Sequence, residues 1–240
     1  MDAIRNNMQV VSERIARAAA AAGRNSDSVR LLAVSKTHPV ELIEEAFQAG
    51  QSAFGENYVQ EALEKMDALT RLVGDPRARD VEWHLIGPLQ SNKTRLVAER
   101  FNWVHTVSSA KVARRLSEQR APGQAPLNVL IQVNSSAEAS KSGAALDEAP
   151  ALAHAVAQMP RLRLRGLMAI PEPSHEEDVQ RARFRPVRGL YERLRAEGLE
   201  LDTLSLGMSE DLEAAIAEGS TLVRVGTAIF GTRHREKDAA

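Results

Sequence analysis

The sequence predicts an α/β fold, a single (β/α)8 barrel of the TIM type with one extra helix before its first strand. Three observations lead to this fold class. Eight short apolar runs occur, each too short for a helix but typical of a buried parallel strand. These runs alternate with stretches of helical periodicity, and the connections are short. The length of 240 residues is also close to the roughly 250 that such barrels commonly have.

The elements follow one another without a linker and without a repeat beyond the strand–helix period. The predicted strands are residues 31–34, 53–56, 82–87, 103–107, 127–134, 162–170, 201–206 and 222–225. The predicted helices are residues 2–22, 40–49, 58–72, 91–100, 109–119, 144–158, 176–197 and 209–218. We expect residues 1–240 to form one domain, with 1–29 as the first helix and its lead-in and 233–240 as a frayed tail. A doubly wound open sheet is the alternative, because local pattern cannot show closure.

Single residues set the expected ends and bends of these helices. Asn57 should cap the second helix of the barrel, and Ser209 should cap the helix after the seventh strand. Pro186 should kink the long helix at 176–197 or split it into two. The extra helix at the amino terminus should pack across the outside or the base of the barrel.

Composition excludes several classes of function. The formal net charge is −1 and the basic residues are dispersed, so no nucleic-acid partner is expected. Cysteine is absent, which excludes disulfides and thiolate metal sites and suits a reducing cytosol. The start of the sequence lacks the apolar core of a signal peptide, and no apolar stretch approaches the roughly 20 residues of a membrane span. We therefore expect a soluble, cytoplasmic, monomeric protein without membrane contact.

Lys36 is the first candidate for chemistry. It ends the apolar run Leu31–Val34, and Pro39 stands where the next helix should begin. Lys36 is therefore expected at the carboxyl end of a buried strand, where α/β barrels place their active sites. Partial desolvation there would lower the pKa of its amine and favour imine formation. The alternative is a lysine that only extends its amine to solvent.

The loops after the seventh and eighth strands resemble an anion site. Ser209 should begin a helix, and helix amino termini offer unpaired N–H groups to an anion. Gly226 ends the last strand and lets backbone N–H groups approach a ligand closely. Barrels commonly bind phosphate in these two loops. Glu210 and Asp211 argue against an anion unless their side chains point outward, and an ordinary capped helix is the alternative.

Arg224 links the two candidates. Val223 and Val225 must face opposite to Arg224, so the arginine points into the barrel if the valines pack under helices. An inward guanidinium needs an acceptor, which could be a carboxylate such as Glu56 or a ligand nitrogen. A lysine that forms imines, a phosphate cup and an arginine aimed at an aromatic nitrogen together describe pyridoxal 5′-phosphate (PLP).

Several motifs make the sequence similar to the pyridoxal phosphate homeostasis protein family, which itself resembles the barrel domain of alanine racemase. They occur in one order between about residues 30 and 232: Leu32–Thr37 (LAVSKT), Phe54–Asn57 (FGEN), Trp83–Lys93 (WHLIGPLQSNK), Gly166–Met168 (GLM), Leu206–Ser209 (LGMS) and Val225–Gly231 (VGTAIFG). One position departs from the pattern, because the family often has a second lysine where this chain has His38.

The resemblance implies a role for each matched position. Lys36 would carry PLP as an internal aldimine, and Arg224 would face the pyridine nitrogen. Asn57 would lie beside the ring. The phosphate would be held by three residues, Ser209, Gly226 and Thr227. Met208 and Lys141 are secondary candidates.

The expected function is to buffer, store or deliver PLP, possible recipients being PLP-dependent apoenzymes, without robust turnover. An arginine beside the pyridine nitrogen weakens the electron sink that amino-acid chemistry needs. Racemisation also requires a second base, for which Tyr58 is the one candidate because Tyr191 belongs to an outer helix. A small PLP-dependent amino-acid racemase or lyase is the alternative. A third hypothesis is a barrel enzyme for a phosphorylated metabolite, with Lys36 as its Schiff-base lysine.

Two further groups of residues lie near the expected carboxyl face. Lys141 is the only lysine in the polar loop 135–143, and it could contact the phosphate or act as a transient second amine during release. The alternative is a solvated loop lysine. Four residues near strand ends are interpreted as core residues and kept out of the site: His84, His105, Asn134 and Met168. No histidine and carboxylate cluster has metal-ligand spacing.

Overall fold

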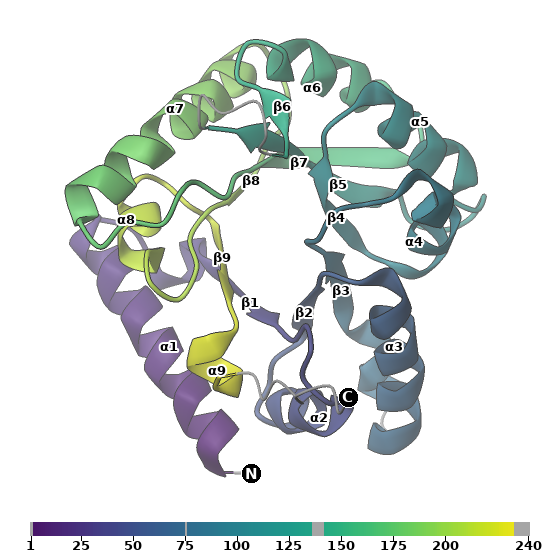
Figure 1. Cartoon of the computed structure of the whole chain (residues 1–240), viewed down its shortest axis with the longest axis vertical. Coiled ribbons are helices and arrows are strands. Elements are labelled where there is room, and N and C mark those ends of the chain that lie inside the picture. Colours follow the sequence, from purple (N-terminus) through teal and green to yellow (C-terminus); the bar gives the residue numbers. More distant parts are fainter. Residues whose placement is uncertain (1, 75, 136–141, 233–240) are drawn as a thin grey trace, which may run out of the picture.

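The computed structural model describes residues 2–74, 76–135 and 142–232, and in these ranges eight parallel strands close into a barrel (Figure 1). The strands are β1 (Arg30–Val34), β2 (Ala53–Glu56), β3 (Glu82–Leu85), β4 (Trp103–Val107), β5 (Leu127–Asn134), β7 (Leu162–Met168), β8 (Thr203–Ser205) and β9 (Leu222–Val225). Neighbours in the sequence pair in order, and β9 pairs with β1 through the partners Leu32 and Arg224. The predicted barrel is confirmed, and the open sheet is excluded.

The helices form an outer ring around the strands (Figure 1). They are α1 (Asp2–Ala21), α2 (Val40–Gln48), α3 (Val59–Val73), α4 (Thr94–Arg100), α5 (Ala110–Gln119), α6 (Ala149–Ala157), α7 (Glu177–Ala196), α8 (Leu212–Ala217) and α9 (Thr227–Phe230). The extra helix α1 packs outside the barrel against α8 and α9, and Asn7 Nδ2 donates to the carbonyl of Ile229 at 2.8 Å. In the described part of the chain, no helix combines the length and the apolar character needed to cross a membrane.

The structure differs from two expectations about the helices. Residues 144–158 do not form one helix, because Ala144–Ala145 add a short strand, β6, beside β5, and α6 begins only at Ala149. Pro186 does not split α7, which runs through it. Pro186 is exposed, so solvent can bind the carbonyl whose hydrogen-bond donor the proline removes.

The expected caps also differ. Tyr58, and not Asn57, precedes the first residue of α3, without a side-chain cap. Asp211, and not Ser209, takes this place before α8, because β8 already ends at Ser205 and α8 begins only at Leu212. Ser109 does cap α5, by accepting a hydrogen bond from the backbone N–H of Val112.

The core has two parts, because successive residues of a strand face opposite sides. One large apolar cluster fills the space between the strands and the helices. Inside the barrel are two small apolar clusters, one of Leu32, Ala53 and Leu222 and the other of Trp103, Leu130 and Met168. The barrel interior is therefore only partly apolar, and the rest of its space is available to polar side chains.

A β-bulge in β7 shapes one side of the barrel. The partners of β5 change from Val129 opposite Leu164 to Leu130 opposite Gly166, so Arg165 is the extra residue. Gly166 has a φ of 152°, and a Cβ there would lie 1.7 Å from the carbonyl oxygen of Thr203. Only glycine fits this position, because β8 approaches too closely for any side chain.

A buried ion network fixes the carboxyl end of β1 from outside the barrel. Lys65 of α3 donates to the Ser35 carbonyl at 2.7 Å, to Glu56 Oε1 at 2.8 Å and to Glu61 Oε1 at 2.5 Å. The Ser35 hydroxyl also donates to Glu56 Oε1, at 2.7 Å. Burial raises the pKa of the Glu56 carboxyl, although the charge of Lys65 opposes this shift.

Substitution of Gly166 tests the close approach of β7 and β8. We expect Gly166→Ala to destabilise the fold by on the order of 3 kcal/mol, from a steric clash and an unfavourable φ. Gly189→Ala is the matched control, since Gly189 lies in α7 with open space around its Cα, and alanine should stabilise the helix by about 0.5–1 kcal/mol. Urea denaturation of both variants measures the difference. Equal midpoints would contradict the close approach.

The Lys65 network predicts a stability that depends on pH. Lys65→Met leaves Glu56 buried without its cation and should cost about 3–5 kcal/mol near pH 7.5. The pKa of Glu56 is then higher in the folded than in the unfolded chain, so stability is lost as pH rises through the folded value. As pH falls from that value toward the carboxyl's usual pKa of 4.5, the loss should shrink. Urea midpoints of Lys65→Met between pH 4.5 and 8 test this, and Lys65→Met/Glu56→Gln should remove the pH dependence.

Candidate functional site

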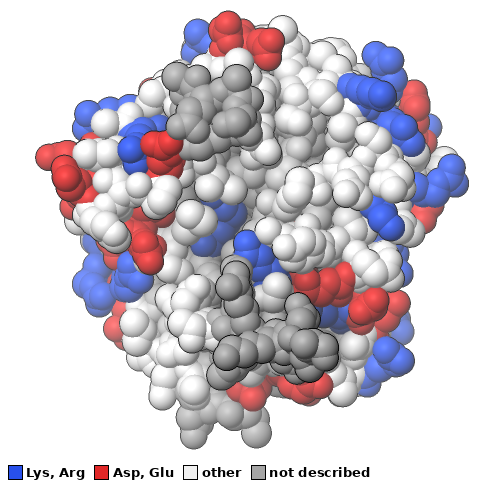
Figure 2. All heavy atoms as spheres, viewed as in Figure 1, with Lys and Arg blue, Asp and Glu red and all other residues white. Residues whose placement is uncertain are grey.

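One pocket of about 260 Å³ opens at the carboxyl ends of the strands. Seven of the predicted site residues line it together: Lys36, Asn57, Met208, Ser209, Arg224, Gly226 and Thr227. The eighth, Lys141, lies outside the described residues. Basic side chains reach the centre of the molecular face in Figure 2, whereas the acidic ones lie farther out. The sequence therefore identified residues that the fold brings into one cavity.

Lys36 sits in a strained turn directly after β1. The next residue, Thr37, has a φ of 64°, which a β-branched residue adopts only under constraint. Two hydrogen bonds supply this constraint, since Thr37 N–H donates to Glu61 Oε1 at 2.5 Å and His38 N–H donates to the Ser35 carbonyl at 3.1 Å. Lys36 itself is half-buried. The turn gives its side chain a defined starting point at the edge of the pocket.

His38, for which no role was expected, also lines the pocket. Its side chain is buried, and its ring centroid lies 5.2 Å from that of Phe230 after β9. A lysine at this position could not make the same ring contact. His38 thus joins the turn after β1 to the end of α9.

Arg224 points into the barrel, as its alternation with two buried valines predicts. The guanidinium is 3% exposed and donates from Nη1 to the Ser205 carbonyl and hydroxyl, both at 2.7 Å, and from Nη2 to the Ala169 carbonyl at 3.0 Å. Burial lowers the pKa of Arg224 to about 10, so it stays charged near pH 7. Glu56 is not its acceptor, because Glu56 faces Lys65 outside the barrel.

Arg224 keeps hydrogen-bonding capacity for a ligand. A guanidinium has five N–H groups, and three of them are used in the contacts just given. Within the described ranges, the remaining groups, one on Nη2 and the Nε–H, have no acceptor. Since Arg224 lines the pocket, an electronegative ligand atom there could accept from it. The protein therefore fixes the guanidinium on one side, and its unused N–H groups can donate to a ligand in the pocket on the other.

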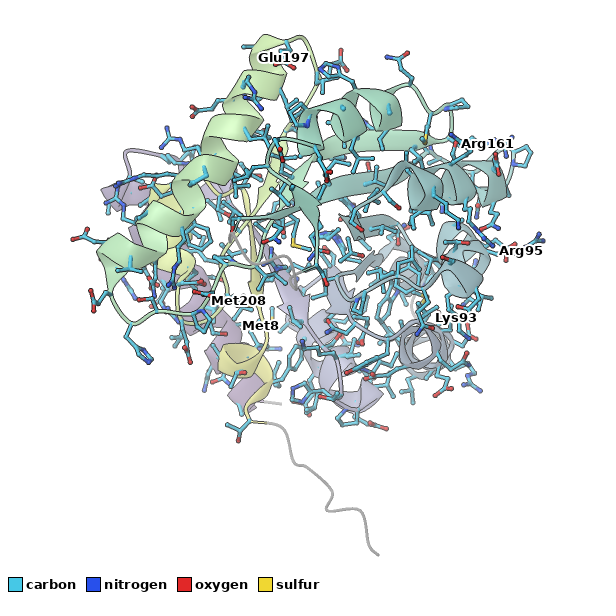
Figure 3. The ribbon with its side chains drawn as sticks, turned by 45° about the horizontal axis from the view of Figure 1, so that its top comes forward. Met8, Lys93, Arg95, Arg161, Glu197 and Met208 are labelled. Atoms are coloured by element: carbon cyan, nitrogen blue, oxygen red, sulfur yellow. The ribbon has the colours of Figure 1, made fainter. Side chains whose placement is uncertain are left out.

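The loop between β8 and α8 is shaped by Gly207, Asp211 and α1. Gly207 has a φ of 91°, and a Cβ there would lie 2.6 Å from the Ala215 side chain. Met208, labelled in Figure 3, is partly exposed at the edge of this loop, and its N–H donates to Asp211 Oδ1 at 2.6 Å. The Ser209 carbonyl accepts from Arg14 Nη2 at 3.0 Å, which ties the loop to α1.

The acidic residues of this loop, Glu210 and Asp211, both line the pocket. Glu210 is exposed, and the carboxylate of Asp211 is occupied by the Met208 N–H. Burial raises the pKa of the Asp211 carboxyl above its usual value. The Ser209 side chain, free of the expected capping role, remains at the pocket wall.

Gly226 and Thr227 form the opposite wall of the cavity. Gly226 precedes α9, and a Cβ at Gly226 would come within 3.1 Å of the Val34 carbonyl. The first N–H groups of a helix lack partners within that helix. With the loop after β8, they can surround an anion such as a phosphate on two sides.

The sequence did not reveal part of the lining. The missed residues are Val34, Ile86, Ile170, Pro173, Ser174 and Gln180. Ile86 could have been found, since it is two positions after His84 and shares the inward face of its strand. No sequence pattern marks Gln180, because it lies on the outer helix α7. Its side-chain amide donates to the Ser174 and Glu210 carbonyls, at 2.6 and 3.4 Å, and these contacts hold it at the pocket.

The residues kept out of the site have different positions. His84, His105 and Met168 are fully buried and absent from the pocket lining. Tyr58, the candidate second base, is 57% exposed and does not line the pocket. Tyr191 packs in α7 and donates to the Leu201 carbonyl at 3.1 Å. Over the described ranges, no group of histidines and carboxylates could hold a metal ion.

Comparisons with known proteins show which chains this one resembles. The model of the family described as "Alanine racemase, N-terminal domain" matches residues 1–234. The pyridoxal phosphate homeostasis protein of Pseudomonas aeruginosa is 57% identical over 97% of both chains. The solved structure of PipY from Synechococcus elongatus with PLP bound is 39% identical, with a TM-score of 0.76 over 85% of this chain and 93% of PipY.

A more distant solved structure shares only the fold with this chain. Alanine racemase of Corynebacterium glutamicum is 20% identical, with a TM-score of 0.70, and the match covers 96% of this chain but 61% of the racemase. This comparison shows the shared barrel alone. On the family model and the close relative together, this chain belongs to the alanine racemase N-terminal domain family and, within it, to the pyridoxal phosphate homeostasis proteins.

Proposed function

We propose that this protein binds PLP in the pocket and serves to buffer or deliver the cofactor inside the cell. The observation that carries the proposal is the meeting of Lys36, Arg224 and two glycine-shaped loops in one cavity. The PLP-bound structure of PipY and the name of the Pseudomonas relative support the choice of ligand.

The residues that line the pocket can make the bonds and contacts that PLP requires. The amine of Lys36 would form a covalent bond to the aldehyde of PLP with loss of one water molecule. The unused N–H groups of Arg224 would donate to the pyridine nitrogen, and Asn57 would lie beside the ring. The phosphate would bind at the Ser209 loop and at Gly226 and Thr227. PLP supplies an electrophilic aldehyde and a conjugated ring, while the protein supplies binding, orientation and charge.

We favour a carrier over a racemase or lyase for a chemical reason. A guanidinium cannot give a proton to the pyridine nitrogen, so it keeps the ring a weak electron sink. Tyr58, the residue that a minimal racemase would need as its second base, is turned to solvent. We further propose that the protein acts in the cytoplasm as a monomer and that PLP-dependent apoenzymes receive the cofactor. Lys141 would assist its release.

Covalent capture by Lys36 is directly testable. Borohydride reduction of the protein with bound PLP should place a pyridoxyl group on Lys36, and Lys36→Ala should lose the adduct and the visible absorbance band. Lys111→Ala, at an exposed lysine of α5, is the matched control and should keep both. Mass spectrometry of the reduced peptides gives the position. A pyridoxyl group on another lysine of the wild type would refute the assignment.

Arg224 is expected to set the electronic state of PLP more than its affinity. In Arg224→Glu the carboxylate would favour a protonated pyridine nitrogen, because an anion stabilises the neighbouring cation. The absorbance and fluorescence of bound PLP should shift, and slow side transamination of amino acids should rise. Borohydride labelling of Lys36 should persist. Arg224→Gln, without a charge, should give an intermediate spectrum. Identical spectra and side activity in all three proteins would remove Arg224 from the ring nitrogen.

A further inference from the structure

A row of buried polar groups crosses the barrel interior and ends at Arg224. Below the row, at the base of the barrel, the partly exposed Glu82 of β3 pairs with Arg30 of β1 at 2.6 Å. His84 Nε2 lies 3.6 Å from Glu82 Oε2, and His84 Nδ1 lies 2.9 Å from His105 Nε2. His105 Nδ1 lies 3.2 Å from the Ser205 hydroxyl. That hydroxyl accepts from Arg224 Nη1 at 2.7 Å.

One assignment of the hydrogens lets each group of this row donate to the next. The Ser205 hydroxyl accepts from Arg224, so its own hydrogen is free to donate to His105 Nδ1. With that donation, His105 carries its hydrogen on Nε2 and donates to His84 Nδ1. His84 then carries its hydrogen on Nε2, which has no hydrogen-bond partner in the described ranges and lies 3.6 Å from Glu82 Oε2. In this assignment the three hydrogen bonds point the same way, from the cation Arg224 to His84.

This assignment requires two neutral imidazoles, and the surroundings supply that condition. Burial lowers the pKa of His84 to about 4 and that of His105 well below its usual value. Both rings are therefore uncharged near pH 7. The His84 ring stacks on Trp103, with centroids 5.1 Å apart and planes 7° from parallel, which restricts its rotation.

This row of polar groups also helps to fix the guanidinium of Arg224, which has few other hydrogen-bond partners. Within the described ranges, Arg224 makes no hydrogen bond to a carboxylate, and its other acceptors are the carbonyls of Ser205 and Ala169. The two carbonyls limit where the guanidinium can lie. The Ser205 hydroxyl fixes it further only if its own hydrogen is committed elsewhere, and His105 provides that acceptor.

We propose that His105 and Ser205 are positioning residues, which form a polarised relay that holds the Arg224 guanidinium against the pyridine nitrogen of bound PLP, and that His84 keeps the hydrogen of the His105 ring on Nε2. The inference rests on the proposed function, since it needs PLP in the pocket. It goes further, because it assigns residues inside the barrel a role in setting the electronic state of PLP. Neither histidine touches the ligand, because neither lines the pocket.

Two amide substitutions at His105 separate the halves of the relay. The side-chain amide of asparagine reaches about as far as Nδ1, and that of glutamine about as far as Nε2. His105→Asn should keep the contact to Ser205 and lose the one to His84, whereas His105→Gln should do the reverse. If the relay acts on Arg224 through Ser205, His105→Asn should bind PLP nearly as the wild type does. His105→Gln should raise Kd on the order of 3- to 10-fold and shift the pH midpoint of the PLP absorbance band.

A double-mutant cycle tests the link to Arg224. Ser205→Ala and His105→Gln should each change Kd and the pH midpoint, and the double variant should be no worse than the stronger single variant. Leu130→Ala is the control for a structural effect, because Leu130 packs in the barrel interior without joining the relay. It should lower the urea midpoint and leave the spectrum of bound PLP unchanged.

The outcomes separate the two proposals. If the wild type binds PLP but His105→Gln and Ser205→Ala match it in Kd and pH midpoint, or if their effects add, the relay is refuted and the proposed function stands. If the wild type shows no visible band with PLP, the proposed function itself fails. If His105→Gln does not fold, Ser205→Ala tests the relay with the same readouts, and a Kd and pH midpoint equal to those of the wild type would refute it.

Discussion

The pairing of β1 with β9 is the constraint on which the site depends. Lys36 follows β1 near the start of the chain, and Arg224 lies in β9 near its end. The register that sets Leu32 beside Arg224 brings the turn after β1 next to Gly226. Without this closure, the lysine and the phosphate loops would belong to opposite edges of an open sheet. The barrel therefore makes one cavity out of residues almost 200 positions apart in the chain.

Polar networks secure the two central residues of this cavity from opposite sides of the sheet. Outside the strands, Lys65 binds the Ser35 carbonyl and two carboxylates, and thereby stabilises the strained turn at Thr37. Inside the barrel, Ser205 and Ala169 hold the guanidinium of Arg224. Buried polar groups are costly unless they are hydrogen-bonded, so each network favours one arrangement of its members. Such rigidity suits a site that must recognise the same ligand repeatedly.

The walls of the pocket, by contrast, come from loops that helices brace. Arg14 of α1 binds the loop after β8, and Gln180 of α7 connects this loop to the one after β7. Met208 and Ile170 remain partly exposed at the entrance. A carrier has to bind its cofactor and also release it. The rigidly held residues at the bottom of the pocket suit binding, and the separate loops that form its walls suit release. The extra helix α1 thus contributes to the site without lining it.

The sequence by itself determined the fold class and most of the pocket. Periodicity and strand length are local properties, so the eight strands could be read directly, and Lys36 and Arg224 followed from their places on strands. Resemblance to a family added Asn57 and Thr227, which no pattern marks. The caps of α3 and α8 and the start of α6 were misplaced, because helix ends depend on contacts that the local pattern does not contain.

Only the tertiary structure decided what surrounds these residues. The partner of Arg224 was Ser205 and not Glu56, because the two faces of a strand belong to different environments once the barrel has closed. The bulge at Gly166, the ion network of Lys65 and the hydrogen-bonded row from His84 to Arg224 each join segments distant in sequence. Such contacts arise from the register between strands and from packing around them, and neither is encoded in any single stretch of the chain.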